Sequence, residues 1–151
     1  PDYFRALNNT KILKVRFPNA VRPWQYVLDP LFGYLLLAKR CYKMKKIDYE
    51  SWNFAQNNKK IIKVKNLISE LNKYFLVKVN FKNKAKFKKE KKYLNLSSQR
   101  SNKFLRWNAI YNIQETIKQI VEWETFFRKY KKVDFICKKQ INEYLNKAKL
   151  N

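Results

Sequence analysis

Short stretches of alternating apolar and polar residues predict the strands of this chain. Residues 12–17 alternate between two sets. Leu13, Val15 and Phe17 form an apolar set, and Ile12, Lys14 and Arg16 form the other, which is typical of a strand. Pro18-Asn19 then marks a turn. Further strands are predicted at 52–54, 77–81 and 93–96.

Helical spacing dominates the remaining segments. The clearest helix begins at Asn112, where Glu115 three residues later completes a variant of the capping box, and continues over 113–130. Another helix is predicted with Asp29 as its N-cap and Pro30 in its first position, ending in the run 43–46. Further helices are predicted at 2–8, 63–76, 99–105 and 138–146.

The order of these elements indicates the fold class. Strands alternate with helices, which predicts a layered α/β domain and not a helical bundle. Residues 56–58 are expected to form a polar turn, and the lysine-rich residues 82–92 an exposed loop. Because there are no repeats and no Pro/Gly/Ser-rich linker, residues 1–151 are expected to form a single portion without an internal boundary.

Composition excludes several kinds of chemistry. The 151 residues contain no histidine, which excludes a Ser-His-Asp triad and histidine-ligated metals. A single glycine, Gly33, cannot build a glycine-rich phosphate loop. Cys41 and Cys137 are far apart and have no metal-site spacing, so we expect no metal site and a reducing cytoplasm. No apolar run reaches the length of a membrane span.

The charge of the chain is strongly positive. Lys and Arg number 35 against 11 Asp and Glu, a formal net charge of +24. Such a surface attracts phosphates and anionic polymers, and one interpretation is therefore a basic nucleic-acid- or ribosome-associated protein. The other is compositional: Lys occurs 28 times and Asn 17 times, and both have AT-rich codons, so genomic base bias alone produces such a charge.

Two segments carry a more specific signal. The first is Phe17-Pro-Asn-Ala-Val-Arg-Pro-Trp-Gln, continuing to Gly-Tyr-Leu-Leu-Leu-Ala38; the second contains Tyr93-Leu-Asn-Leu, Trp107 and Glu115-Thr-Ile-Lys-Gln-Ile-Val-Glu-Trp123. In order and spacing, with Trp52-Asn-Phe54 between them, both resemble the second half of the CDP-glucose 4,6-dehydratases. These are sugar-nucleotide lyases of the extended short-chain dehydrogenase/reductase superfamily. The NAVRPWQ run is the most specific part of the resemblance.

The resemblance implies a fold, an activity and partners. It implies that the chain is the C-terminal substrate-binding portion of an extended short-chain dehydrogenase/reductase, an α/β fold, and that the NAD-binding Rossmann half is absent. It also implies that the full-length enzyme is a homodimer. In the family, bound NAD oxidises the sugar at C4, water is eliminated across C5 and C6, and the hydride returns to C6, giving CDP-4-keto-6-deoxyglucose. The absent half carries NAD and the Tyr-x-x-x-Lys pair. We therefore expect no catalytic residue in this chain, which alone is expected to be inactive.

The resemblance also implies residues that bind CDP-glucose. Arg22 matches the arginine that binds the pyrophosphate in related enzymes, a role that suits a planar guanidinium. Asn53 matches the asparagine of the WNFGP segment near the same pyrophosphate, and Trp24 and Gln25 lie beside Arg22 in sequence. Lys92 lies where related enzymes place a second phosphate cation.

The sequence departs from the family pattern at several positions. The Gly-Pro that follows WNF is Ala55-Gln56 here, the Asp of the LxLD segment is Ser97, and the glycine of LGW is Arg106. These departures leave three interpretations open: the substrate-binding half of a dehydratase, a basic nucleic-acid- or ribosome-associated protein, and an inactive decayed fragment.

Overall fold

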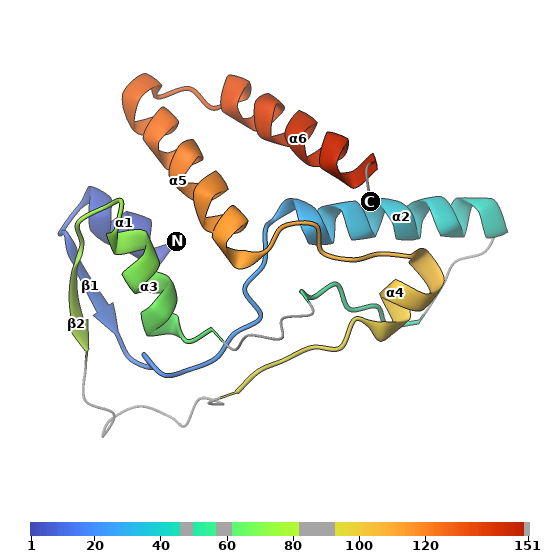
Figure 1. Cartoon of the computed structure of the whole chain (residues 1–151), viewed down its shortest axis with the longest axis horizontal. Coiled ribbons are helices and arrows are strands. Elements are labelled where there is room, and N and C mark those ends of the chain that lie inside the picture. The colour runs from blue at the N-terminus through green and yellow to red at the C-terminus, as the bar shows by residue number, and fades with distance from the viewer. Residues whose placement is uncertain (46–49, 57–61, 82–92, 150–151) are drawn as a thin grey trace. The chain divides into compact units, whose positions relative to one another are not determined.

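A computed structural model describes residues 1–45, 50–56, 62–81 and 93–149 (Figure 1). The chain divides into two compact units. Unit 1 comprises Pro1–Arg22 and Lys59–Asn95, and unit 2 comprises Pro23–Asn58 and Leu96–Asn151. The predicted turn at 56–58 falls partly, and the predicted loop at 82–92 entirely, outside the described residues. The single nucleotide-sugar-binding portion over 1–151 remains a prediction.

In its described part, unit 1 is a small parallel sheet with two helices. Strands β1 (Ile12–Val15) and β2 (Lys78–Phe81) pair in parallel, with Ile12 opposite Lys78. Helices α1 (Asp2–Asn8) and α3 (Val64–Asn72) lie beside the strands (Figure 1). The Tyr3 hydroxyl lies 2.7 Å from Asn72 Oδ1 and 2.8 Å from the Phe75 carbonyl oxygen, and these two acceptors share its one proton, which joins α1 to the end of α3. Burial raises the pKa of Tyr3 to about 12.

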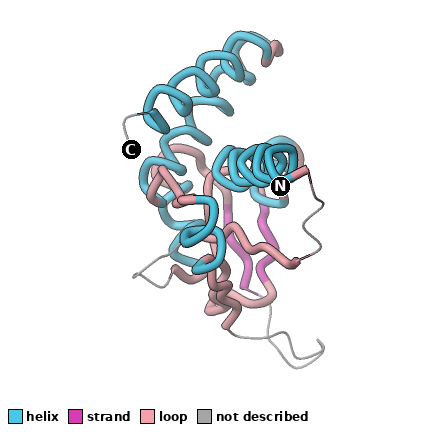
Figure 2. The backbone as a smooth tube through the Cα atoms, turned by 90° about the vertical axis from the view of Figure 1, so that its right-hand side faces the viewer, coloured by secondary structure: helices cyan, strands magenta, loops and turns pink. Residues whose placement is uncertain are grey.

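Unit 2 is helical in its described part. Its helices are α2 (Leu28–Met44), α4 (Gln99–Leu105), α5 (Ile113–Tyr130) and α6 (Asp134–Lys149). Helices α5 and α6 form a hairpin, drawn in orange and red in Figure 1 and in cyan in Figure 2. Three tyrosines form a core cluster, with ring centroids 5.0 Å apart for Tyr26 and Tyr111 and 5.7 Å apart for Tyr111 and Tyr144.

The capping box predicted for α5 is confirmed. Asn112 Oδ1 accepts hydrogen bonds from the backbone N–H groups of Gln114 (2.9 Å) and Glu115 (3.0 Å). In return, the Asn112 N–H donates to Glu115 Oε2 at 2.8 Å. The box satisfies backbone donors that the first helical turn leaves without partners, so the predicted start of the helix is also its observed start.

The prediction that Asp29 is an N-cap is wrong. Helix α2 begins at Leu28 after Val27, which places Asp29 inside the first turn. The Asp29 side chain is completely buried, and its Oδ1 accepts hydrogen bonds from the Ile110 N–H (2.8 Å) and the Tyr144 hydroxyl (2.9 Å). The carboxylate therefore joins distant segments and does not cap its own helix.

Four other predicted elements differ from the structure. Residues 52–54 form no strand, because side chains and not a neighbouring strand take their backbone hydrogen bonds. In 93–96, Tyr93 makes an isolated bridge to Val21 and the segment forms no strand. Helix α3 stops at Asn72, well before the predicted residue 76, whereas α6 extends beyond both predicted ends of 138–146.

The mixed α/β character of the prediction holds for the described residues. They combine helices with a two-stranded parallel sheet. None of their helices is long and apolar enough to cross a membrane. Part of the predicted apolar stripe of α2 lies on the surface, since Leu31, Tyr34 and Leu35 are all exposed.

We expect Arg106→Gly to stabilise the protein by roughly 0.5–1 kcal/mol. Arg106 ends α4 with φ 53° and ψ 29°, a left-handed conformation that costs less for glycine than for a side chain with a Cβ. The matched control is Lys103→Gly within α4, which should destabilise by about 1 kcal/mol. Urea denaturation of the three proteins measures both changes, and a destabilised Arg106→Gly variant would contradict the prediction.

Candidate functional site

The loop that carries Arg22 is fixed by the start of α3. The Lys65 N–H donates to the Pro18 carbonyl at 2.9 Å, and the Val64 N–H donates to the Ala20 carbonyl at 3.0 Å. Val21 also makes an antiparallel bridge to Lys63. These bonds occupy backbone donors at the N-terminus of α3, so the helix holds the loop in place.

Two more bonds restrict the end of this loop. The Leu94 N–H donates to the Val21 carbonyl at 3.3 Å, in line with the parallel bridge between Tyr93 and Val21. The guanidinium of Arg22 donates from Nη1 to the same carbonyl at 2.7 Å. Arg22 is half-buried. The backbone of this loop is therefore fixed on both sides, and the arginine extends from a restrained position.

Gln25 holds the segment that follows Trp52. Its Nε2 donates to the Phe54 carbonyl at 2.8 Å, and its Oε1 accepts from the Gln56 N–H at 3.0 Å. The Ser101 hydroxyl donates to the Asn53 carbonyl at 2.5 Å, so a second side chain fixes the same segment. Both polar atoms of the Gln25 amide are thus engaged with backbone, and Gln25 is a positioning residue in this structure.

The other predicted site residues have different surroundings. Asn53 has an exposed side chain although its backbone is held, and Trp24 is half-buried. Both belong to unit 2 together with Gln25, whereas Arg22 belongs to unit 1. Lys92 lies outside the described residues. The roles of all five residues in binding CDP-glucose remain proposals.

The backbone at the family's Gly-Pro position accommodates Ala55-Gln56. Ala55 is buried, and the Ser98 hydroxyl donates to its carbonyl at 2.5 Å. Gln56 Nε2 donates to the Tyr111 carbonyl at 2.6 Å. Ser97 replaces the Asp of the family's LxLD segment, and its Oγ accepts a long hydrogen bond of 3.4 Å from the Gln99 N–H at the start of α4. The side chains of Gln56 and Ser97 therefore each have a hydrogen bond in unit 2, and Ala55 is held through its backbone carbonyl.

Sequence reasoning missed how Asp29 and Gly33 support this region. The Asp29 carbonyl accepts from Trp107 Nε1 at 2.9 Å, in addition to the two bonds to its carboxylate. A Cβ on Gly33 would lie 2.8 Å from Phe54 Cγ, so the ring of the Trp52–Phe54 segment packs directly on the glycine. The Phe54 ring also contacts Trp107, with centroids 5.3 Å apart. These partners are too distant in sequence for a local pattern to reveal.

Burial changes the acid–base behaviour of the core beside this region. Loss of solvent raises the pKa of Asp29, and its hydrogen bonds to Ile110 and Tyr144 offset only part of that effect. Burial raises the pKa of Tyr26 and Tyr144 as well, so both hydroxyls stay protonated and can donate. Among the described residues, no group of three or more potential metal ligands lies together.

Comparison with known proteins gives one curated relative. No protein-family profile matches the chain. The chain is 27% identical over 153 residues to the CDP-glucose 4,6-dehydratase of Salmonella typhimurium, an alignment that covers 97% of this chain and 41% of the relative. The chain resembles a CDP-glucose 4,6-dehydratase. The resemblance predicted from the sequence motifs is thus confirmed, and the chain is distantly related to an enzyme that is a lyase.

Proposed function

We propose that this chain is the nucleotide-sugar-binding portion of a CDP-glucose 4,6-dehydratase. The observation that carries the proposal is the NAVRPWQ run within an alignment that covers nearly the whole chain. Arg22 binds the pyrophosphate of CDP-glucose, and the fixed loop 18–22 presents it in one orientation. Asn53 and Lys92 are proposed as further phosphate donors, and Trp24 as a packing surface for the nucleotide.

Gln25 contributes through the backbone of the Trp52–Phe54 segment. Its amide holds Phe54 and Gln56 on either side of Ala55, which restrains the segment from which the exposed Asn53 side chain extends. A site whose contacts are restrained beforehand loses less conformational entropy when the ligand binds. We therefore propose that Gln25 positions Asn53 and does not itself bind the phosphate.

The residues of this chain do not fit the cofactor NAD that the resemblance implies. The one glycine, Gly33, lies buried within α2 against the Phe54 ring and cannot contribute to a glycine-rich dinucleotide turn. Tyr42 and Lys46, or Tyr74 and Lys78, have the spacing of a Tyr-x-x-x-Lys pair, but 10 Tyr among 28 Lys produce about two such spacings by chance. We assign NAD and catalysis to the part of the relative that this chain does not cover.

A turnover assay tests the assignment of nucleotide-sugar binding to this chain and of catalysis to the part of the relative that it does not cover. The 151-residue chain, incubated with CDP-glucose and NAD, should give no 4-keto product, because its residues include neither a dinucleotide turn nor a credible catalytic pair. A chimaeric protein, in which this chain replaces the matching 41% of the Salmonella relative, should convert CDP-glucose. Mass spectrometry detects the product through the loss of one water.

The controls are the intact Salmonella enzyme and its remaining portion without this chain. The intact enzyme should be active and the remaining portion inactive. Product formed by the 151-residue chain alone would contradict the assignment of catalysis. A folded chimaera that binds CDP-glucose but gives no product would contradict the proposal that this chain is a competent dehydratase portion.

A further inference from the structure

Three successive backbone carbonyls of unit 2, those of residues 53–55, accept hydrogen bonds from side chains. The Ser101 hydroxyl donates to the first at 2.5 Å, Gln25 Nε2 to the second at 2.8 Å and the Ser98 hydroxyl to the third at 2.5 Å. Residues 50–56 form neither a helix nor a strand, so these side chains supply donors that a neighbouring strand would otherwise supply. We call residues 53–56 the clamped segment.

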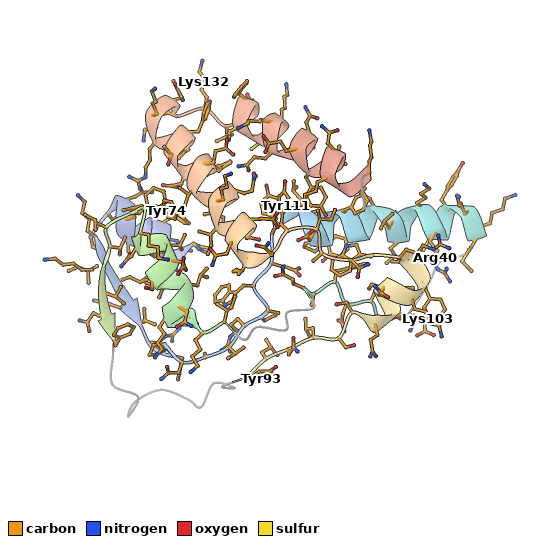
Figure 3. All side chains as sticks on the ribbon, in the orientation of Figure 1. Arg40, Tyr74, Tyr93, Lys103, Tyr111 and Lys132 are labelled. Atoms are coloured by element: carbon orange, nitrogen blue, oxygen red, sulfur yellow. The ribbon has the colours of Figure 1, made fainter. Side chains whose placement is uncertain are left out.

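The two serines of this clamp belong to α4, which is itself anchored. Ser98 directly precedes the helix, and Ser101 lies within its first turn. The backbone N–H of the buried Trp107 donates to the Ser101 carbonyl at 3.2 Å. Figure 3 shows α4, which carries the labelled Lys103, beside α2, which carries Arg40. The serine hydroxyls therefore come from a helix that is fixed in the core of unit 2.

Asn53 is the one residue of the clamped segment whose side chain is exposed. Phe54, Ala55 and Gln56 are all buried. The Phe54 ring packs directly on Gly33 of α2. The buried ring and the hydrogen-bonded carbonyls fix the backbone at residue 53 and after it, and so they also fix the direction of the Cα–Cβ bond of Asn53. Only rotation about the side-chain torsions of Asn53 remains.

The burial of the serines indicates how they act. Ser101 is completely buried, so its hydroxyl acts on the Asn53 carbonyl and not on a ligand. Ser98 is half-buried, and its hydroxyl also accepts from the Ala55 N–H at 3.4 Å. Removal of the Ser101 hydroxyl would leave the Asn53 carbonyl without this donor, at the residue whose side chain extends outward.

We propose that Ser98 and Ser101 are positioning residues that orient Asn53 toward the pyrophosphate of CDP-glucose. The inference rests on the proposed function, in which the Asn53 amide donates to a phosphate oxygen. A hydrogen bond weakens steeply when its angle departs from linearity, so a displaced backbone at residue 53 weakens the contact. An amide on a backbone that is already fixed also loses less conformational entropy when it binds.

Calorimetric titration of CDP-glucose tests the proposal through a double-mutant cycle, in the 151-residue chain and in the chimaera. Asn53→Ala should bind about tenfold more weakly or worse, because it loses a hydrogen bond to a charged group. Ser101→Ala should bind about three- to tenfold more weakly, since the amide remains but is misplaced. In the Asn53→Ala background, Ser101→Ala should add less than about a twofold loss. A serine with a purely structural role would cause the same loss in both backgrounds.

The matched control is Ser97→Ala. Ser97 is an exposed serine beside α4 whose Oγ accepts from the Gln99 N–H, and its loss should leave the affinity within about twofold. Thermal melting identifies any variant that fails to fold. Ser98→Ala provides the second test, because this half-buried position tolerates truncation better than Ser101. Ser98→Thr, which keeps the hydroxyl, should restore the affinity to within about twofold of the parent.

The outcomes separate this inference from the proposed function. The positioning role would be overturned if Ser101→Ala caused the same loss with and without Asn53, or if Ser101→Ala and Ser98→Ala both bound like the parent. Either result would leave Asn53 as a phosphate donor. Parent-like affinity of Asn53→Ala, or no binding by the parent, would instead contradict the proposed role of Asn53 and the inference together.

Discussion

Asp29→Ala is expected to destabilise the protein more than any other substitution considered. Removal of the carboxylate leaves the Ile110 N–H and the Tyr144 hydroxyl without their acceptor. Each buried or part-buried donor left without a partner costs about 1–3 kcal/mol. Asp29→Asn is the matched control, because its amide oxygen can still accept both bonds and should preserve most of the free energy of unfolding. Urea denaturation measures both, and an Asp29→Ala variant as stable as the parent would contradict the expectation.

The same residue predicts a dependence of stability on pH. Because burial raises the pKa of Asp29 in the folded state, the folded protein binds this proton more tightly than the unfolded chain. This contribution is fully present below the ordinary carboxyl pKa of about 3.9 and is lost as pH rises through the raised folded value. The free energy of unfolding of the parent, minus that of Asp29→Asn, should therefore fall as pH rises from about 3.9 through the raised folded pKa of Asp29. A difference that rises would contradict the assignment.

Gly33→Ala is expected to have the second largest effect. Alanine favours a helix over glycine by about 1 kcal/mol, so helix propensity alone predicts stabilisation. The new Cβ would, however, lie 2.6 Å from Phe54 Cε1 and 2.8 Å from Cγ, which requires the whole ring to move. Overpacking typically costs about 1–3 kcal/mol, and the backbone around Phe54 is restrained by Gln25 and Ser98. We expect net destabilisation in thermal unfolding.

A double variant distinguishes this clash from a general effect of substitution in α2. Phe54→Leu removes part of the ring, so Gly33→Ala should destabilise a Phe54→Leu background less than it destabilises the parent. Leu35→Ala in the same helix is the control, because Leu35 is 67% exposed and its truncation should change stability little. Stabilisation by Gly33→Ala in the parent would show that the close contact is relieved without cost.

The sequence predicted correctly those helices and strands that are determined by residues close together in the chain. The capping box at Asn112 and Glu115 is such a case, because both partners lie within one turn and α5 starts as predicted. The strand β2 and the helix α4 also lie where alternation and spacing place them. Arg22 lies on a restrained loop, although the sequence alone did not show which helix fixes it.

Contacts between distant residues account for the errors. The early end of α3 follows from Asn72, whose side chain donates to the Val77 carbonyl at 3.1 Å and accepts from Tyr3. The buried face of α6 is also not a continuous apolar stripe, because Gln140 is buried on it together with Ile136 and Tyr144. Gln140 is satisfied by the Gln119 carbonyl at 2.9 Å, a partner on another helix.

Titration of CDP-glucose into the parent and into Arg22→Ala tests the central proposal most directly. Loss of a charged hydrogen bond to the pyrophosphate should weaken binding by about 1.5–3 kcal/mol, or roughly 10- to 150-fold. The matched control is Arg16→Ala, because Arg16 is an exposed arginine directly after β1 and its loss should leave the affinity within about twofold. The measurement is made on the 151-residue chain and on the chimaera with the Salmonella relative. A specific loss in Arg22→Ala is the predicted result, whereas equal affinities of parent and Arg22→Ala in the chimaera would contradict Arg22 as the pyrophosphate ligand.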